Sequence, residues 1–307
     1  MDIQIQGLSK SYGMQRAVDD ISFEVRQGEI LGFLGPNGAG KTTTMKMITH
    51  YLEMDAGQIL IGGKSIENGS LRRHIGYLPE NNPLYEEMPV MDYLAFCAAL
   101  HGVDKSQIQD RIRKMIKVCG LDVEKHKKIA ELSKGYRQRV GLAQAMIHDP
   151  EVLILDEPTT GLDPNQIVEI RELIRQLGKQ KTVILSTHIL PEVEATCDRI
   201  LIINRGKIVA DGSAEDLRRQ ASGRQISKIR IENVPIQEVF DTLSSLPSVG
   251  SVDIIDGEMG RYEVESNVGQ TSNAAIFHTC VQKGWTLTEL TPLETKLEDI
   301  FRNLTTN

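Results

Sequence analysis

A glycine-rich loop between an apolar run and a helical pattern constrains this chain most strongly. Residues 35–42 read GPNGAGKT, with ILGFL before them and TTTMKMITHYL from residue 42 onward. Glycines let successive backbone N–H groups turn towards one anion, and a following helix points its positive end at the same place. A chance match to G-x-x-x-x-G-K-[ST] in a chain of this length is on the order of one per cent. The pattern predicts a strand–loop–helix unit that holds the phosphates of a nucleotide, and its spacing differs from that of a dinucleotide-binding G-x-G-x-x-G loop.

Within this loop the side chains have separate expected roles. Lys41 can reach the β- and γ-phosphates, and the Thr42 hydroxyl can bind Mg²⁺. The other residues would surround the phosphates with backbone N–H groups. The predicted nucleotide-binding residues of the loop are Gly35, Pro36, Asn37, Gly38, Ala39, Gly40, Lys41, Thr42 and Thr43.

Two adjacent carboxylates follow a second apolar run. Residues 152–158 read VLILDEP, so Asp156 and Glu157 come directly after a buried strand, at the edge where open α/β sheets bind ligands. Alone, this pattern fits a solvated acidic turn equally well. With a phosphate loop upstream, we expect Asp156 to hold Mg²⁺ and Glu157 to deprotonate an attacking water, a role worth about 10²–10⁴-fold in rate.

Short β-branched and aliphatic runs alternate with longer helical patterns through residue 220. Continuous apolar runs such as VLILD and TVILS suit parallel strands that are buried on both faces, so this part is predicted to be α/β with a mixed sheet. Residues 81–150 are mostly helical in pattern and predict an inserted helical subdomain. The predicted strands are residues 3–8, 21–25, 29–35, 74–80, 151–158 and 182–188, with a hairpin over residues 199–212.

A polar stretch at residues 218–225 predicts a linker, and a domain boundary is expected near residue 220. Residues 221–307 hold seven Lys and Arg against twelve Asp and Glu, so this part is acidic. Its pattern has the order βαββαβ, which predicts a small α+β ferredoxin-like domain. The predicted elements are strands at 226–232, 251–256, 261–265 and 286–290 and helices at 236–246, 272–283 and 293–304.

Composition excludes several classes of protein. The chain has 35 Lys and Arg against 42 Asp and Glu, a net charge of −7, which offers no general attraction for nucleic acid. No apolar run approaches the ~20 residues of a membrane span. The start, MDIQIQGLSKSYG, lacks the basic and apolar segments of a signal peptide. We therefore expect neither a signal peptide nor a transmembrane segment.

A second anion site is predicted at residues 132–136, LSKGY, where Ser133 is a natural N-cap of the helical run that follows. With this motif in place the chain resembles the ABC ATPases, the nucleotide-binding subunits of ABC transporters. The resemblance covers residues 1–220 and its motifs come in the family's order. They are Tyr12 for adenine stacking, the phosphate loop, Glu80, Ser133 with Gly135, Asp156 with Glu157, residues 161–163 and the switch histidine His188.

The resemblance implies ATP and Mg²⁺ as cofactors and two copies of the cassette. ATP on the phosphate loop of one chain would be closed over by Ser133 and Gly135 of the other, in a homodimer. Thr42, Glu80 and Asp156 would bind the metal. Glu157, His188 and Lys41 would be catalytic, and a multi-pass membrane permease would be the partner at the cytoplasmic face of the inner membrane.

Some positions depart from the family's pattern. Glu80 stands where the family usually has Gln, and Lys134 and Tyr136 replace two residues of LSGGQ. These variants resemble the gliding-motility-associated and antibiotic- or sodium-export cassettes of bacteria, which implies an exporter. The alternative is a soluble ABC ATPase acting on ribosomes or DNA, although such proteins usually carry a second cassette or a long coiled coil. A P-loop GTPase or kinase leaves His188 unexplained.

Overall fold

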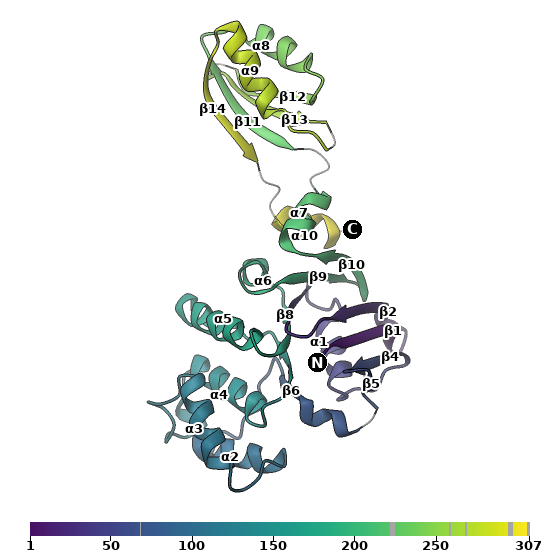
Figure 1. Ribbon diagram of the computed structural model, residues 1–307, viewed down its shortest axis with the longest axis vertical. Helices are drawn as coiled ribbons and strands as arrows, with labels where there is room; N and C mark the ends of the chain where they lie inside the picture. Colours follow the sequence, from purple (N-terminus) through teal and green to yellow (C-terminus); the bar gives the residue numbers. More distant parts are fainter. Residues whose placement is uncertain (68, 222–224, 258, 268, 294–296, 306–307) are drawn as a thin grey trace. The chain divides into compact units, whose positions relative to one another are not determined.

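The computed structural model describes residues 1–307 except 68, 222–224, 258, 268, 294–296 and 306–307. The chain divides into two compact units, one of Met1–Ala214 with Leu304–Asn307 and one of Glu215–Asn303 (Figure 1). The predicted linker at residues 218–225 falls partly on 222–224, which lie outside the described residues. The domain limits at residue 220 and at residues 81–150 stay predictions.

Among its described residues, the first unit contains a four-stranded sheet, in the order β2-β1-β4-β5, and a six-stranded sheet, in the order β10-β9-β3-β8-β7-β6. The strands are β1 (Ile3–Tyr12), β2 (Gln15–Val25), β3 (Ile30–Leu34), β4 (Ala56–Ile61), β5 (Lys64–Ser65), β6 (Ile75–Leu78), β7 (Val152–Asp156), β8 (Thr182–Thr187), β9 (Arg199–Asn204) and β10 (Lys207–Gly212). The helices are α1 (Lys41–Ile48), α2 (Val90–Leu100), α3 (Ile108–Val118), α4 (Lys134–Met146), α5 (Pro164–Gly178) and α6 (Leu190–Thr196), with 3₁₀ turns η1 (Gly69–His74) and η2 (Ile129–Glu131).

The centre of the six-stranded sheet is parallel and fully buried, as the apolar runs predict. β7 pairs in parallel with β8 and β6, and every residue of β7 is buried. Leu153 and Leu155 belong to the core cluster that includes α2, α3, α4 and α5, while Val152 and Ile154 belong to the cluster that includes α1 and the four-stranded sheet. Successive side chains of a strand point to opposite faces, so a strand covered on both sides must be apolar throughout.

Some predicted elements differ from the structure. Strands β4 and β5 were not predicted, because β4 gains its hydrogen bonds from the distant β1 and the two-residue β5 pairs only with β4. The helical pattern from residue 42 to 52 is wrong beyond Ile48, since Thr49 is the C-cap and His50 has a φ of 53°. The hairpin is confirmed: β9 and β10 pair antiparallel around Arg205 and Gly206, both with positive φ.

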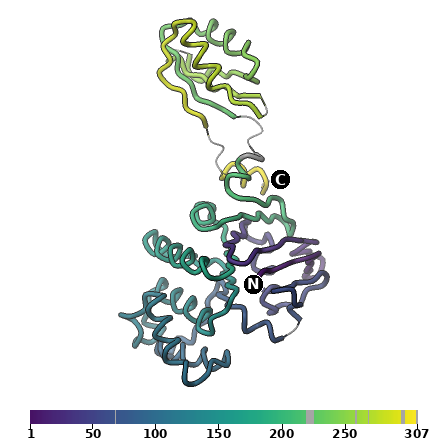
Figure 2. Tube along the Cα trace, in the orientation of Figure 1, coloured from purple at the N-terminus to yellow at the C-terminus, as the bar shows by residue number. Residues whose placement is uncertain are grey.

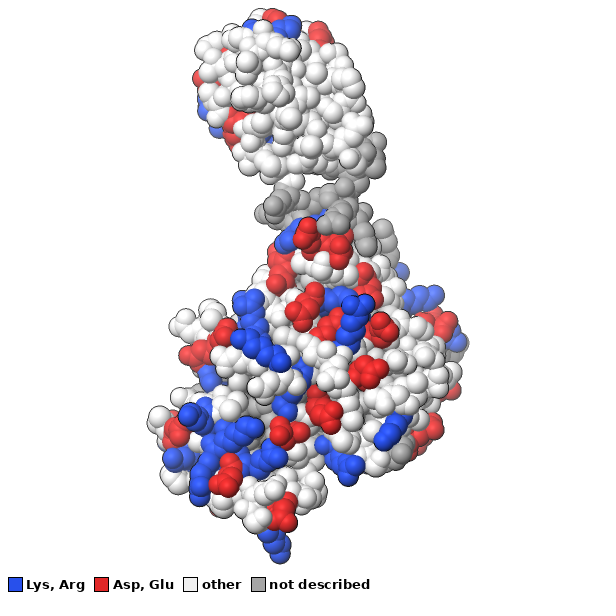
Figure 3. Space-filling view, in the orientation of Figure 1, with Lys and Arg blue, Asp and Glu red and all other residues white. Residues whose placement is uncertain are grey.

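Between β6 and β7 the chain leaves the sheet and forms α2, α3, η2 and α4 before it returns (Figure 2). This is the stretch in which helices were expected. In the view of Figure 3, Lys and Arg gather over this part of the molecule. Helix α3 carries the exposed residues Arg113, Lys114 and Lys117. The charged side chains of the first unit are therefore not evenly distributed over its surface.

The second unit has the predicted order of elements. It contains β11 (Ile226–Glu232), α8 (Ile236–Ser244), β12 (Val249–Asp256), β13 (Arg261–Ser266), α9 (Asn273–Lys283) and β14 (Thr286–Leu293), and α7 (Ala214–Ala221) and α10 (Leu297–Thr305) flank them in the chain. The antiparallel sheet order is β12-β13-β11-β14, that of a ferredoxin-like unit.

The predicted start of the closing helix at residue 293 is wrong. Leu293 is the last residue of β14 and pairs with Ile226, while the helix starts at Leu297. β14 is an edge strand, and an edge strand tolerates Pro292 because it need not donate a ladder hydrogen bond on its open side. Pairing with β11 thus extends the strand over residues that local pattern assigned to a loop and a helix.

Gly76 of β6 is predicted to be essential for the packing of α4 on the sheet. A Cβ at residue 76 would lie 2.1 Å from the carbonyl oxygen of Ala145 in α4, which is backbone and cannot rotate away. We expect Gly76→Ala to lower the free energy of unfolding of the first unit by about 1–3 kcal/mol, measured by chemical denaturation. Gly69→Ala is the matched control, since a Cβ there meets nothing within 4 Å, and equal effects of the two changes would contradict the packing argument.

Candidate active site

The loop between β3 and α1 has the geometry of an anion-binding turn. Gly40 is the N-cap of α1 with a φ of 111°, and none of the described side chains caps the helix. A Cβ at residue 40 would lie 2.4 Å from the carbonyl oxygen of Ala17, so both the backbone conformation and the space require glycine. The first N–H groups of α1 and its positive dipole end thus point out of the loop together.

Lys41 is buried within this loop. Its Nζ donates to the carbonyl oxygen of Gly35 at 2.8 Å and to that of Pro36 at 3.3 Å, and it lies 3.6 Å from Glu157 Oε1. These contacts hold a positive charge between the loop and the end of β7. Gly35 and Pro36 therefore contribute to the site through the carbonyl oxygens that accept from Lys41. Neither residue lines the cavity beside α1.

A cavity of about 440 Å³ opens beside α1. It brings together most of the predicted nucleotide-binding residues with Glu80 and Glu157. Tyr12 lies at its rim and is 51% exposed, which leaves its ring accessible. The cavity is lined by Tyr12, Gln15, Ala17, Asn37, Gly38, Gly40, Lys41, Thr42, Thr43, Glu80 and Glu157.

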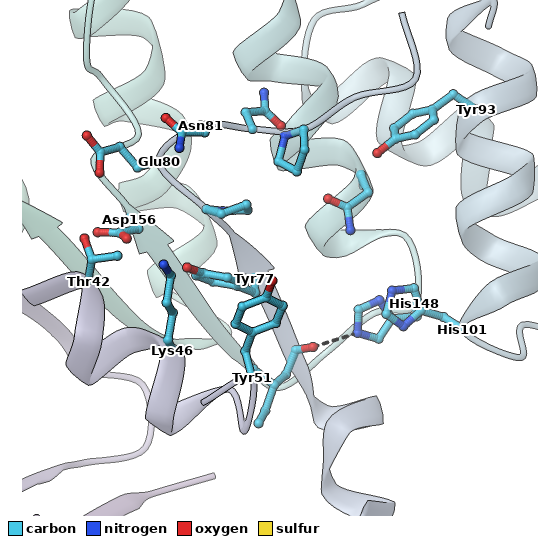
Figure 4. Close-up of a pocket in the computed structure, with 15 residues that line it drawn as sticks. Thr42, Lys46, Tyr51, Tyr77, Glu80, Asn81, Tyr93, His101, His148 and Asp156 are labelled. Carbon is cyan, nitrogen blue, oxygen red and sulfur yellow. Dashed lines mark hydrogen bonds between the residues drawn. The ribbon is translucent and has the colours of Figure 1, made fainter. Parts of the chain in front are cut away.

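Asp156 is fully buried at the end of β7. The hydroxyl of Ser186 donates to its Oδ1, whereas Oδ2 has no hydrogen-bond partner among the described residues. Burial raises the pKa of Asp156 above its ordinary value, and nearby Glu157 raises it further, against the opposing influence of the Ser186 and Thr42 hydroxyls and of Lys41. Figure 4 shows the Thr42 hydroxyl beside the carboxylate, with Glu80 close to both. An unpartnered buried carboxylate oxygen next to a hydroxyl is a donor set that suits Mg²⁺.

Glu157 occupies a strained position just beyond β7. Its φ is 50°, uncommon for a residue with a side chain, and the residue is 5% exposed. Nδ1 of His188 lies 3.0 Å and 2.9 Å from its two carboxylate oxygens, and the Thr160 hydroxyl donates to Oε2 at 3.2 Å. The carboxylate is therefore aimed at the phosphate loop and held there by three neighbours: Lys41, Thr160 and His188.

The structure does not bring Ser133 and Gly135 to this cavity. Ser133 is the N-cap of α4, as predicted, and its Oγ accepts from the N–H of Tyr136 at 3.4 Å. Gly135 is buried, and a Cβ there would lie 2.6 Å from the amide carbon of Gln166 in α5. The predicted second anion site thus sits on the exposed N-terminus of α4, apart from the phosphate loop of its own chain.

Sequence reasoning missed Ser186 and Thr160 as residues of the site. Ser186 bonds Asp156 through its hydroxyl and receives the N–H of Glu157 at both its hydroxyl, 3.2 Å, and its carbonyl oxygen, 3.1 Å. The only sequence signal that could have identified Ser186 was its position two residues before His188. Asp163, the last residue of the 161–163 motif, is the N-cap of α5 and accepts from the N–H groups of Asn165 and Gln166.

A second cavity, of about 580 Å³, shares Thr42 and Glu80 with the first and is also lined by Asp156 (Figure 4). Its far wall is the imidazole ring of His148, stacked on His101 with ring centroids 3.9 Å apart. Nε2 of His148 contacts the carbonyl oxygen of Ile75 at 3.1 Å. His148 therefore joins the helical segment to the first residue of β6.

Comparisons with known proteins give one consistent result. Residues 18–160 match the family model for "ABC transporter". The chain is 34% identical to the ABC transporter ATP-binding protein YxlF of Bacillus subtilis over 97% of this chain and 98% of the relative. It is 35% identical to the bacitracin transport ATP-binding protein BcrA of Bacillus licheniformis, over 98% and 96%. A solved ATP-binding subunit of an ABC transporter superposes with a TM-score of 0.66 at 33% identity, over 72% of this chain and 94% of that one.

The described helices include none long and apolar enough to cross a membrane.

The stacked histidines predict a pH-dependent stability. Burial lowers the pKa of His148 from 6.5 to about 4, and the neighbouring His101 adds to the effect. The unfolded chain takes up a proton near pH 6.5 that the folded ring refuses until about pH 4, so stability is lost as the pH falls through that window. We expect His148→Gln, measured by urea denaturation from pH 7 to pH 4, to reduce that loss by about 1–2 kcal/mol. His126→Gln, at an exposed ring, is the control; an unchanged pH dependence in His148→Gln would contradict this assignment.

Proposed function

This chain belongs to the family of ABC transporter ATP-binding proteins, and we propose how its residues perform that work. It is the ATP-hydrolysing subunit of an ABC transporter. The observation that carries the proposal is the meeting of Lys41, Glu157 and His188 at one end of the parallel sheet, beside the loop that begins α1. Every step below uses groups that this cluster places within reach of a bound triphosphate.

ATP binds in the cavity beside α1. The N–H groups at the start of α1 and the ammonium of Lys41 receive the β- and γ-phosphates. The exposed ring of Tyr12 at the rim provides a flat surface for adenine, a contact that aromatic rings make with any base.

Mg²⁺ fits the group formed by Thr42, Asp156 and Glu80. The free Oδ2 of Asp156 is the supporting observation, since a buried carboxylate oxygen without a partner is costly unless a cation or water meets it. Glu80 supplies a carboxylate where relatives of this family usually carry an amide. Bound there, the ion neutralises charge on the phosphate oxygens during phosphoryl transfer.

Glu157 orients and deprotonates the attacking water. Its carboxylate lies at the boundary of the phosphate cavity, and Nδ1 of His188 holds it in position. His188 is 44% exposed at its side chain, so the other ring nitrogen remains available for a γ-phosphate oxygen. Positioning and charge neutralisation account for most of such catalysis, because phosphoryl transfer needs little covalent chemistry from the protein.

A second copy of the chain completes the site. The cavity beside α1 contains no residue of the Ser133 motif, and the N-terminus of α4 that carries this motif is exposed. An exposed helix N-terminus with a capping hydroxyl can bind the γ-phosphate held by a partner. We propose a head-to-tail homodimer that closes on two ATP molecules and reopens after hydrolysis.

The dimer drives a multi-pass permease at the cytoplasmic face of the inner membrane. Tyr85 and Phe96 form an exposed aromatic pair, with centroids 5.6 Å apart, at the start of the helical segment. Exposed paired rings are typical of binding surfaces for a protein partner. The similarity to a bacitracin transport protein favours an exporter. The net charge of −7 disfavours the alternative of a soluble ATPase on ribosomes or DNA.

Glu157→Gln tests the catalytic proposal. The amide keeps the size of the side chain but cannot accept the proton of water, so ATP hydrolysis should fall by about 10²–10⁴-fold while ATP binding changes little. Because the bound ATP is not hydrolysed, the dimer should accumulate, which size-exclusion chromatography with light scattering would detect. Glu151→Gln, near the opposite end of β7, is the control. Wild-type turnover in Glu157→Gln would remove Glu157 as the base, and a strictly monomeric ATP-bound form would remove the composite site.

Phe96→Asp tests the permease surface. A charge in place of this ring should reduce the permease retained by the tagged chain about tenfold in co-purification from membranes, equivalent to about 1.4 kcal/mol. Val123→Asp, at another exposed apolar position that is 82% exposed, should retain the permease. Equal retention by both variants would place the contact elsewhere.

A further inference from the structure

A buried carboxylate lies behind the catalytic pair and belongs to none of the motifs discussed above. Glu192, in the first turn of α6, is 3% exposed. A carboxylate is seldom buried to this extent unless its oxygens receive hydrogen bonds, because loss of water is costly. The partners of Glu192 therefore indicate what holds it there.

Both partners come from the loops that carry the active-site side chains. The hydroxyl of Thr159 donates to Glu192 Oε2 at 2.7 Å, and the hydroxyl of Thr187 donates to the same oxygen at 2.9 Å. Thr159 lies two residues after Glu157, and Thr187 directly precedes His188. One carboxylate oxygen thus joins the end of β8 to the loop that follows β7.

The same two loops meet again at the active site. Nδ1 of His188 lies 2.9 Å from Glu157 Oε2, and the hydroxyl of Thr160, the residue after Thr159, donates to the same oxygen. The Thr187 hydroxyl also accepts from the N–H of Ile189, which fixes the backbone on the far side of His188. Polar contacts therefore join the two loops at two places. One place faces the phosphate cavity, and the other is buried at Glu192.

We propose that Glu192 is a positioning residue that keeps Glu157 and His188 in register for hydrolysis. The proposal rests on the proposed roles of those two residues. The β7–β8 ladder holds the chain only as far as Asp156 and Ser186. Beyond it, the positive φ of Glu157 is strained and persists only where the surroundings determine it. Glu192 provides that constraint through hydrogen bonds to a carboxylate, which are stronger than those between neutral groups.

Steady-state kinetics of the full chain separate positioning from folding. We expect Glu192→Ala to lower kcat by about 10–100-fold, since a displacement of about 1 Å at a reacting group can cost 10²-fold. The KM for ATP and the stoichiometry of bound nucleotide should change less than about threefold, because the hydroxyls that Glu192 receives come from Thr159 and Thr187, which are outside the phosphate loop. A merely structural role would instead lower the bound nucleotide in proportion to activity.

Conservative variants sharpen the test. In Glu192→Gln the amide oxygen can still accept both hydroxyls, so kcat should return to within about threefold of wild type. Thr159→Val removes one hydroxyl at constant shape and should lower kcat by about 3–10-fold. The effect of Thr159→Val should vanish in the Glu192→Ala background, because the acceptor is already gone. Thr196→Val is the matched control: its buried hydroxyl lies on the same helix and has no partner among the described residues.

The outcomes distinguish this proposal from the proposed function. If Glu157→Gln abolishes turnover while Glu192→Ala and Thr159→Val hydrolyse ATP at the wild-type rate, the positioning role is wrong and the base stands. If Glu157→Gln itself turns over normally, the assignment of the base is wrong. Full additivity of Thr159→Val with Glu192→Ala, or a Glu192→Gln variant as slow as Glu192→Ala, also overturns the proposal. Should Glu192→Ala not fold, Thr159→Val and Glu192→Gln decide alone.

Discussion

The parallel pairing of β7 with β8 is the constraint on which the active site depends. Parallel strands end at the same edge of a sheet, so the register that places Asp156 opposite Ser186 also brings the next residues of both strands together. Glu157 and His188 are 31 residues apart in the chain, and this register brings them close enough for Nδ1 of His188 to lie 2.9 Å from Glu157 Oε2. β3 pairs with the other side of β8, which adds the phosphate loop to the same edge. Three segments distant in sequence thus contribute to one site.

The burial of these apolar strands also buries the carboxylate at the end of β7, and this changes the electrostatic properties of the site. A strand buried on both faces also buries its terminal carboxylate, which raises the pKa of Asp156, and the Oδ2 of Asp156 has no hydrogen-bond partner among the residues that the structure describes. This oxygen, beside the cavity, is the basis for the proposed Mg²⁺ site. Burial also strengthens the interaction of Lys41 with Glu157, because the dielectric constant inside the protein is low. The core that stabilises the sheet therefore also sets the electrostatic environment of the site.

The two predicted anion sites of the chain lie on different structural elements. The phosphate loop lies on the central sheet, where β3 and β8 hold it rigidly, while Ser133 lies at the end of α4 in the helical segment. Gly135 and Gly76 keep this helix close to α5 and β6, since a side chain at either position would collide with its neighbour. This separation explains why a single copy carries both kinds of residue and why their union in one site is proposed for a pair of chains.

The local features of this protein could be predicted from its amino-acid sequence. The GPNGAGKT loop, the acidic pair after VLILD, the Ser133 N-cap and the βαββαβ order all follow from spacings of a few residues, and short-range rules govern them. Tertiary structure decided what depends on pairing between distant segments. Strand β4 forms because β1 pairs with it, and β14 extends to Leu293 because β11 pairs with it. Ser186 meets Asp156 through the β7–β8 register, and Glu192 of α6 receives the hydroxyls of Thr159 and Thr187. No local pattern marks such residues, because a lone serine or glutamate looks the same in sequence whether water or a buried hydroxyl is its partner.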